Sequence, residues 1–398
     1  MRLRKTMKYS SNFWLNRCQF LPISPVCGPG GLSTTTFLLG VLLLLEADML
    51  LCGRQRVVTR LRLLQHRVLS TNPELLALCN SYPALRGRKA GQPDDLFHVH
   101  SAALDLLEEH LVHWPGGCPP VVLEANAGPG LLSRRLVEAG RITSCVRMFE
   151  HRQCFLPELR AQVAAWPTRL ELVEADLLRM HNREGQLLAG ITPRPWTHAP
   201  EAVLVASLSR VREVGFLRYV LHQLPMGTSL FALGRLAFLL FLSHIEAAHI
   251  TASRGINFRH YRDVSILYQL FFHVDVLGQV SRELFLPARG AKTQAPLHLL
   301  RLVPRSDLWN LAGGPERLHE LVFFVRQNMV RRTAYVLPCL EKWIPGCGPR
   351  LLREGATRVF ERMGDLSPER MLRLFQLFSA LPEYTQSAFT AAVAREGS

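Results

Sequence analysis

The sequence predicts an α/β fold with a Rossmann-like parallel sheet, followed by a small helical region. Three observations indicate it: short apolar strands alternate with helical stretches, a glycine-rich turn follows the first strand, and acidic residues stand at strand ends. This succession is typical of doubly wound sheets, which bind nucleotide-like ligands at the carboxyl ends of their strands. The chain has 398 residues, of which 48% are hydrophobic, so we expect two domains with a real core.

The first strand, turn and helix occupy residues 121–140, which read VVLEANAGPGLLSRRLVEAG. Residues 121–124 form a short apolar run that ends in a carboxylate, and residues 131–139 have helical periodicity. Gly128 and Gly130 lie between them. Glycine permits positive φ and lets a ligand approach the backbone closely, so the segment predicts the first unit of a nucleotide-binding sheet.

Three further apolar strands follow the first, and helical stretches separate them. Glu150 comes directly after the second strand and about twenty residues after the glycines, where doubly wound folds place a carboxylate for ribose hydroxyls. Asp176 comes just beyond the third strand, where its side chain could accept from an amino group. The alternative interpretation is that these are ordinary surface carboxylates. The strands are expected at 145–149, 170–173 and 202–206, and helices at 152–165 and 213–223.

The formal net charge is +15, and arginine supplies most of it. Such an excess favours a polyanionic partner, either nucleic acid or an anionic membrane surface. A protein that is basic without a dedicated site is the alternative. The nine cysteines include no C-x-x-C pair, so the sequence predicts no disulfide framework and no zinc site, and the chain is expected to be reduced and intracellular.

The amino terminus has the composition of a targeting segment. The first acidic residue is Glu46, and residues 1–36 are basic and rich in hydroxyl groups, which predicts a mitochondrial transit peptide. A secretory signal is the rival interpretation, because an apolar run at 37–45 follows the basic start. Residues 37–92 are expected to form a basic extension and a linker.

The ordered segments EANAGPGLL, MFEHRQ, VEADLL and VASLSRV resemble the motif series of the rRNA adenine dimethylase family. More narrowly, they resemble the mitochondrial transcription factor B proteins, and among these the second paralogue. The later segments YRDVSILYQLFFHVDV and LHLLRLVPR agree, so the resemblance covers roughly residues 93–385. It implies an S-adenosylmethionine-dependent methyltransferase domain at 93–295 and a C-terminal helical domain at 296–398.

The resemblance also implies where S-adenosylmethionine would lie. Glu124 and the glycines would line its methionine and ribose side, Glu150 would accept from the ribose hydroxyls, and Asp176 would face the adenine amino group. Asn126 stands where active dimethylases carry their first glycine. The implied cofactor residues are Val99, Glu124, Gly128, Gly130, Glu150 and Asp176.

Active members of the family place Asn-Leu-Pro-Tyr or Asn-Leu-Pro-Phe at the end of the fourth strand. There the target adenine stacks on the aromatic ring, while oxygens of the Asn and Pro residues accept from its N6 amino group. The matching positions in this chain are Ser207, Leu208, Ser209 and Arg210, which supply neither the amide nor the ring. The sequence therefore predicts weak or absent methylation, while S-adenosylmethionine binding could persist, in full or in vestigial form.

From residue 296 onward, helical patterns are expected at 316–329, 348–363 and 368–381. Arginines in this region are predicted to line a groove that binds nucleic acid, and the alternative is a packing domain with solvated arginines. Arg210 could add a stacking or phosphate contact at the sheet. The predicted nucleic-acid contacts are Arg210, Arg326, Arg331 and Arg332, and no metal site is expected.

These features predict a transcription initiation factor of the mitochondrial matrix and nucleoid. The resemblance implies the mitochondrial RNA polymerase and promoter DNA as partners, and no integral membrane insertion is expected. The alternative is an enzyme that dimethylates adjacent adenines of the mitochondrial small-subunit rRNA. A factor that binds this rRNA without modifying it is a third interpretation.

Overall fold

The computed structural model describes residues 72–86, 95–114, 121–140, 145–178, 188–287 and 295–397. The predictions of a transit peptide at 1–36 and of a basic segment at 37–70 lie outside the described residues. None of the helices in the described ranges combines the length and the apolar character that a membrane span requires.

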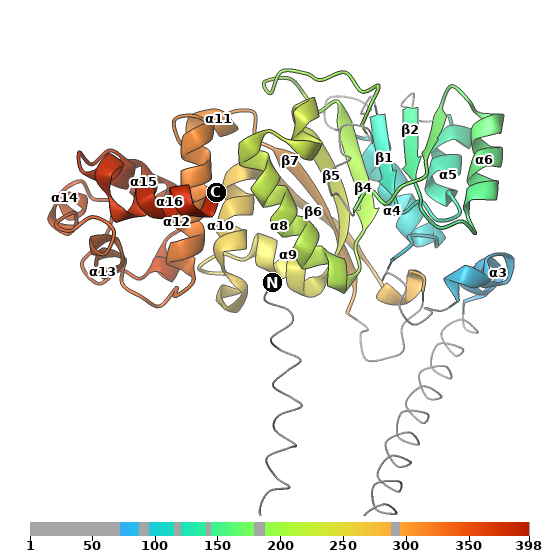
Figure 1. Cartoon of the computed structure of the whole chain (residues 1–398). Coiled ribbons are helices and arrows are strands. Elements are labelled where there is room, and N and C mark those ends of the chain that lie inside the picture. The colour runs from blue at the N-terminus through green and yellow to red at the C-terminus, as the bar shows by residue number, and fades with distance from the viewer. Residues whose placement is uncertain are drawn as a thin grey trace, which may run out of the picture. The chain divides into compact units, whose positions relative to one another are not determined.

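A mixed sheet of seven strands forms the centre of the described chain, in the order β3-β2-β1-β4-β5-β7-β6 (Figure 1). The first five strands in this order are parallel, and β7 runs antiparallel to both of its neighbours. This confirms the predicted Rossmann-like α/β class with a methyltransferase-type sheet. The strands are β1 Val121–Ala125, β2 Cys145–Phe149, β3 Leu170–Val173, β4 Ala202–Ser207, β5 Leu236–Ser243, β6 Phe272–Val280 and β7 Leu297–Pro304.

Helices cover both faces of the sheet, because successive side chains of each buried strand point to opposite sides. On β1, Val122 belongs to an apolar cluster that includes α3, α4 and α5, whereas Leu123 belongs to a second cluster that includes α8, α10 and the C-terminal helices. The helices are α3 Pro73–Ser81, α4 Ser101–Val112, α5 Leu131–Glu138, α6 Leu156–Ala165, α8 Arg210–Met226, α9 His244–Thr251, α10 Asp263–Phe271, α11 Leu308–Leu311, α12 Pro315–Met329, α13 Val336–Glu341, α14 Gly348–Arg353, α15 Pro368–Ser379 and α16 Ala388–Gly397.

The parallel register brings the strand ends together at one edge of the sheet. Ala125 at the end of β1 pairs with Phe149 on β2 and with Ala206 on β4. The residues that follow these three positions therefore meet at the carboxyl edge, where ligands of such sheets lie. This places the glycine turn, Glu150 and Ser207 in one neighbourhood.

The start of the α/β domain was predicted too late, at residue 93. Helix α3 and the following 3-10 turn already bury Leu75, Cys79 and Leu85 in the cluster of α4 and β1. Asn72 caps α3, since its side chain accepts from the backbone N–H of Leu75. The prediction of a basic extension and linker over residues 37–92 overlooked this helix, because a proline- and glycine-rich stretch follows it in the sequence.

The boundary predicted at residue 296 is also wrong. Strand β7, Leu297–Pro304, lies inside the sheet between β5 and β6. The helices beyond it share one apolar cluster with α8, α10 and one face of the sheet. A helix predicted over 348–363 ends at Arg353, because Gly355 turns the chain with a φ of +65°.

Candidate functional site

The glycine turn between β1 and α5 places three residues in the left-handed region, Asn126, Gly128 and Gly130, with φ of 54°, 59° and 70°. Asparagine tolerates this region better than most residues, which allows it to stand where the related enzymes carry glycine. Position 128 requires glycine for a steric reason as well, since a Cβ on Gly128 would lie 2.7 Å from the ring of Phe97. The turn thus passes directly under Phe97.

Glu150 fastens this turn to the end of β2. Its fully buried carboxylate accepts from the backbone N–H groups of Gly128, His151 and Arg152 at 2.8, 2.9 and 2.8 Å. Burial raises the pKa of the Glu150 carboxyl to about 7, although these donors stabilise its charged form. The residue predicted to receive ribose hydroxyls therefore already binds the loop of its own chain.

Glu124 is buried and faces His98 and Ser133. His98 joins it to the end of β4: its Nε2 lies 3.1 Å from a carboxylate oxygen of Glu124, and its Nδ1 lies 2.9 Å from Oγ of Ser207. The hydroxyl of Ser133 donates to the other oxygen of Glu124. His98 was not among the residues predicted for the site, so its position as a buried link between two predicted site residues was missed.

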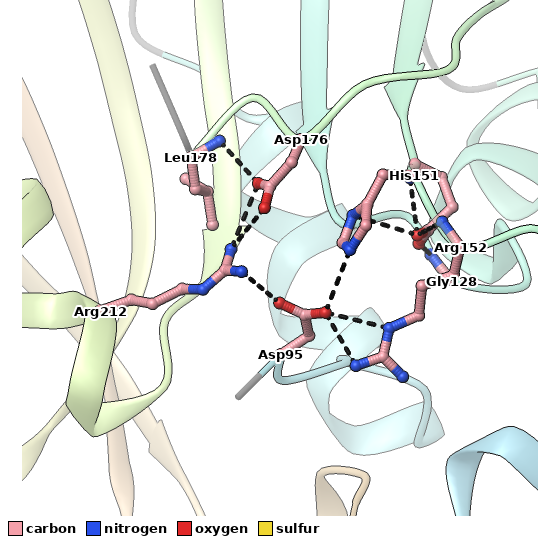
Figure 2. A network of polar contacts seen from close by, with 8 residues as sticks. Asp95, Gly128, His151, Arg152, Asp176, Leu178 and Arg212 are labelled. Carbon is pink, nitrogen blue, oxygen red and sulfur yellow. Dashed lines mark hydrogen bonds and ion pairs between the residues drawn. The ribbon is translucent and has the colours of Figure 1, made fainter. Parts of the chain in front are cut away.

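A cluster of ion pairs lies across the carboxyl edge, and Figure 2 shows Asp95 between two guanidinium groups. Arg152 donates to Asp95 at 2.8 Å through Nη2, and Nη2 of Arg212 lies 2.9 Å from the other oxygen of Asp95. Nη1 of Arg212 donates to both oxygens of Asp176 at 3.0 and 3.2 Å. Nε2 of His151 lies 3.7 Å from Asp95. We call Asp95, His151, Arg152, Asp176 and Arg212 the Asp95 cluster.

Within the Asp95 cluster, Asp176 has a partner that the sequence did not predict. This carboxylate was predicted to face an adenine amino group, and in the structure it accepts from Arg212 and from the backbone N–H of Leu178. Sequence reasoning missed both Asp95 and Arg212. The available signal was local: Arg212 follows the altered tetrapeptide by two residues, so it lies in the first turn of α8 beside the carboxyl edge.

Two unsatisfied polar groups fit a small polar ligand at this edge. The side-chain amide of Asn126 and the hydroxyl of Ser209 are buried and have no hydrogen-bond partner in the described part of the chain. The segment that carries Phe97 and Val99 is buried beside the turn, and Phe97 forms an isolated antiparallel β-bridge with Leu286. A small polar ligand beside the turn could therefore reach the Asn126 amide, whereas the Asp176 carboxylate is already paired with Arg212.

The residues at the tetrapeptide positions point into the fold, except the last. Ser207 contacts His98, and Leu208 is buried while its N–H donates to the carbonyl of Phe241 at 3.1 Å. Ser209 precedes α8, and Arg210 is its exposed first residue. No described residues group three His, Cys, Asp or Glu side chains in a way that could hold a metal ion.

The structure separates the four predicted nucleic-acid contacts. Arg326 forms an ion pair with Glu396 at 3.0 Å. Arg331 is exposed on the turn after α12, and its neighbour Arg332 donates to the carbonyls of Phe258 and Tyr261 at 2.5 and 3.0 Å. Arg210 lies elsewhere, at the start of α8.

The chain is similar in sequence to several proteins that carry the same name, dimethyladenosine transferase 2, mitochondrial. No family model matches the chain. It is 26% identical to "Dimethyladenosine transferase 2, mitochondrial" of Drosophila melanogaster, over 81% of this chain and 85% of that protein. The chain is a homologue of that protein. The bovine and human dimethyladenosine transferases 2 are 24% and 23% identical, over 64% and 66% of this chain and 70% and 72% of theirs.

The dimethyladenosine transferase 2 relatives confirm the resemblance that the four motifs indicated. Among solved structures, a dimethyladenosine transferase from Plasmodium falciparum superposes with a TM-score of 0.47 and 15% identity, covering 69% of this chain and 94% of that one.

Proposed function

We propose that this chain is a mitochondrial transcription initiation factor that assists the mitochondrial RNA polymerase by holding the opened promoter strand. One observation carries the proposal: the positions that would orient a target adenine are turned inward or altered. Ser207 contacts His98, Leu208 is buried, and no aromatic ring stands at these four positions. The mitochondrial location follows from the names of the dimethyladenosine transferase 2 relatives.

The same positions argue against efficient methylation. Transfer to an adenine requires acceptors that hold the N6 amino group and a surface on which the flipped base stacks. Base–aromatic stacking contributes about 1–3 kcal/mol per base, so a site without a ring captures its target poorly. Exposed Arg210 stands where the ring would be, and its charge suits a phosphate or the face of a base.

We propose that S-adenosylmethionine binding persists in weakened form. Asn126, Gly128 and Glu150 would hold its aminoacyl and ribose groups, and Asp176 its adenine, provided that Arg212 releases this carboxylate. When bound, the cofactor would supply a methyl group. Arg212 and the three N–H donors on Glu150 oppose this, because the two carboxylates already have internal partners.

The energetics of strand holding match the composition of the chain. Separating promoter DNA costs about 1.4 kcal/mol of stacking per base-pair step on average. A basic protein offsets this when it binds the unpaired strand through phosphates and stacked bases, with little sequence preference. The excess of lysine and arginine behind the formal net charge of +15 favours such phosphate contacts.

Promoter-dependent transcription with the cognate mitochondrial RNA polymerase tests the proposal. We expect the chain to raise transcript yield from a duplex promoter, and to raise it much less from a template whose start site is already mismatched and open. Equal stimulation of both templates would contradict a role in holding the melted strand. No stimulation of either would refute the function.

The second candidate is dimethylation of adjacent adenines in mitochondrial small-subunit rRNA. The retained turn with its unpartnered Asn126 amide favours it, as does the name of the relatives. Transfer of a labelled methyl group to the rRNA hairpin, abolished by Asp176→Ala, would support this activity. Crosslinking in organelles followed by sequencing would distinguish promoter DNA from rRNA as the bound nucleic acid.

A further inference from the structure

Three segments far apart in sequence meet beyond the sheet. They are the 3-10 turn η3 Phe258–His260, the turn at residues 330–335 after α12, and the loop at 356–364 after α14. Backbone hydrogen bonds join the last two, since the N–H groups of Met363 and Gly364 donate to the carbonyls of Ala334 and Arg332 at 2.9 and 2.7 Å. Gly364 also lies against the ring of Phe258, because a Cβ on Gly364 would approach it to 3.3 Å. We call these segments together the aromatic–arginine surface.

Large rings on this surface are exposed to solvent. Phe360 is 80% exposed, Tyr335 42% and Phe258 40%, while most phenylalanines of the described chain lie in the core. The rings of Tyr335 and Phe360 contact each other edge to face, with centroids 6.3 Å apart. Val330 and Val359 beside them are also exposed. Several exposed rings and apolar side chains on neighbouring segments mark an interaction site.

Arginines alternate with these rings. The guanidinium of Arg332 lies 4.7 Å from the ring centre of Phe258, and that of Arg362 lies 5.8 Å from Tyr335. Arg331 and Arg358 are exposed, and neither forms an ion pair with an acidic residue of the described ranges.

Glu361 is the one acidic residue in the three segments of this surface, and it is buried and paired with Arg370. Asp365, which follows the last segment, lies 3.9 Å from Arg254. Neutral rings with an excess of positive charge therefore face the solvent. This combination suits a polyanion that carries flat apolar groups.

A hollow of about 410 Å³ adjoins the same turn. Arg331 and Ala334 contribute to both, so the hollow and the aromatic–arginine surface are continuous. Lys342 and the half-buried Trp343 also line it, no acidic residue does, and its volume falls within the roughly 300–1,000 Å³ of small-molecule sites. The indole of Trp343 is fixed by edge contacts with Phe323 and Phe389.

We propose that the aromatic–arginine surface and its hollow bind unpaired DNA, with bases stacked on Phe360 and Tyr335, one base in the hollow, and phosphates on Arg331, Arg358 and Lys342. The choice of DNA as the ligand rests on the proposed function. Duplex DNA does not fit, because its bases are stacked on one another and present no faces to the rings. A protein partner is disfavoured by the excess of unpaired cations around the rings.

Fluorescence anisotropy with the full chain and a labelled 16-nucleotide single strand tests this inference. Phe360→Ala should raise the Kd about tenfold or more, since one stacked base is lost. Arg331→Gln should raise it and reduce the salt dependence by about one phosphate contact. Matched controls come from exposed residues of α8: Val211→Ala and Arg218→Gln should leave the Kd within twofold.

Further ligands separate this surface from other binding modes. Phe360→Ala should leave the weaker binding of the duplex form of the same sequence unchanged, and an equal loss on duplex would refute stacking. A loss confined to single-stranded RNA of that sequence would refute DNA as the ligand. If Phe360→Ala weakened binding of the polymerase and left the single strand bound as before, the surface would be a protein interface and the inference would be wrong.

The proposed function can fail separately. If the wild-type chain stimulates promoter transcription and binds the single strand, while Phe360→Ala and Arg331→Gln bind it equally well, only this site is refuted. If both variants lose single-strand binding but the wild-type chain gives no promoter stimulation, the site stands and the function falls. Phe360 and Arg331 are exposed, and unchanged melting temperatures of the variants check their folding.

Discussion

At the scale of single residues, Arg212 decides what the carboxyl edge of the sheet can do. It joins Asp95 to Asp176, and its own side chain is largely buried, so the ion pairs exchange little with water. A guanidinium in this position supplies the donor that an adenine amino group would otherwise provide.

Replacement of Arg212 should therefore destabilise the fold. Arg212→Gln leaves the part-buried Asp176 without its cation and removes one of the two guanidinium partners of the buried Asp95, and breaking a buried ion pair by removing one partner costs about 3–5 kcal/mol. Urea unfolding measures the change in free energy. Arg218→Gln, exposed on the same helix, should change it by less than about 0.5 kcal/mol. A similar small change for Arg212→Gln would mean that the cluster contributes no stability.

The same variant should bind S-adenosylhomocysteine more tightly than the wild-type chain, because Asp176 loses its guanidinium partner and keeps only the backbone N–H of Leu178 among the donors described above. Isothermal titration at a temperature well below the melting point of both proteins measures this. Asp176→Asn serves as the control, since it removes the charge and replaces one acceptor oxygen by a donor NH2 group, and it should bind no better than wild type. Unchanged affinity in Arg212→Gln would show that Arg212 does not compete with the ligand.

Glu150 should make the stability fall as the pH rises from about 4.5 to about 7. Burial raises its pKa to about 7 in the folded state, so between these values the folded chain keeps a proton that the unfolded chain has lost. The stabilisation is fully present below pH 4.5 and is lost as the pH rises through 7, with a limit of about 3 kcal/mol. Glu150→Gln should lose less stability over this range in urea titrations. An identical pH profile would contradict the raised pKa.

At the scale of elements, the turn between β1 and α5 is shaped by both backbone and neighbours. Gly128 and Gly140 have nearly the same φ, 59° and 60°, yet only the first has a neighbour within 4 Å of its missing Cβ. Gly140 follows the end of α5 and has only the unusual φ, whereas Gly128 has the unusual φ and a close neighbour. Alanine substitutions at the two positions therefore separate the energetic cost of backbone strain from that of steric overlap.

Gly128→Ala should cost about 2–4 kcal/mol, because strain at positive φ adds to overlap with the ring of Phe97. Gly140→Ala meets open space and should cost only about 1 kcal/mol. Thermal and urea unfolding of both variants measure the difference. Equal losses would mean that Phe97 moves aside freely and does not fix the turn.

At the scale of the whole described chain, the C-terminal helices belong to the core of the sheet. Phe324 on α12 lies in the same apolar cluster as Leu240 on β5 and Tyr268 on α10. The buried hydroxyl of Tyr261 donates to the carbonyl of Leu366 at 2.7 Å, which joins the two regions by a hydrogen bond as well.

We therefore expect one cooperative unfolding transition. Tryptophan fluorescence, to which Trp196 beside the sheet and Trp343 among the C-terminal helices both contribute, and far-ultraviolet circular dichroism should give the same urea midpoint. Phe324→Ala should shift both midpoints together, by a free energy of about 3–5 kcal/mol. Two separate transitions, with only one moved by Phe324→Ala, would indicate an independent helical domain.

The sequence by itself determined the features that depend on neighbours along the chain. Periodicity located β1, β2 and β3 to within a residue, the glycines marked the turn, and the residues after the fourth strand revealed the altered tetrapeptide. The strands and the turn follow from local backbone preference and from the alternation of buried side chains, which a short segment already contains. The altered tetrapeptide was recognised through the resemblance to the dimethylase family. The two predicted domain boundaries were wrong: helix α3 precedes the predicted start at residue 93, and strand β7 follows the predicted end of the sheet domain at residue 295.

Only the tertiary structure decided which side chains meet. His98 lies 109 residues from Ser207, and the segments of the aromatic–arginine surface span about a hundred residues between Phe258 and Arg362. The energy of an ion pair or a ring contact depends on distance in space and on burial, and neither is encoded in local periodicity. For this reason Asp176 could be located at a strand end from the sequence, while its capture by Arg212 emerged only when α8 packed against the carboxyl edge of the sheet.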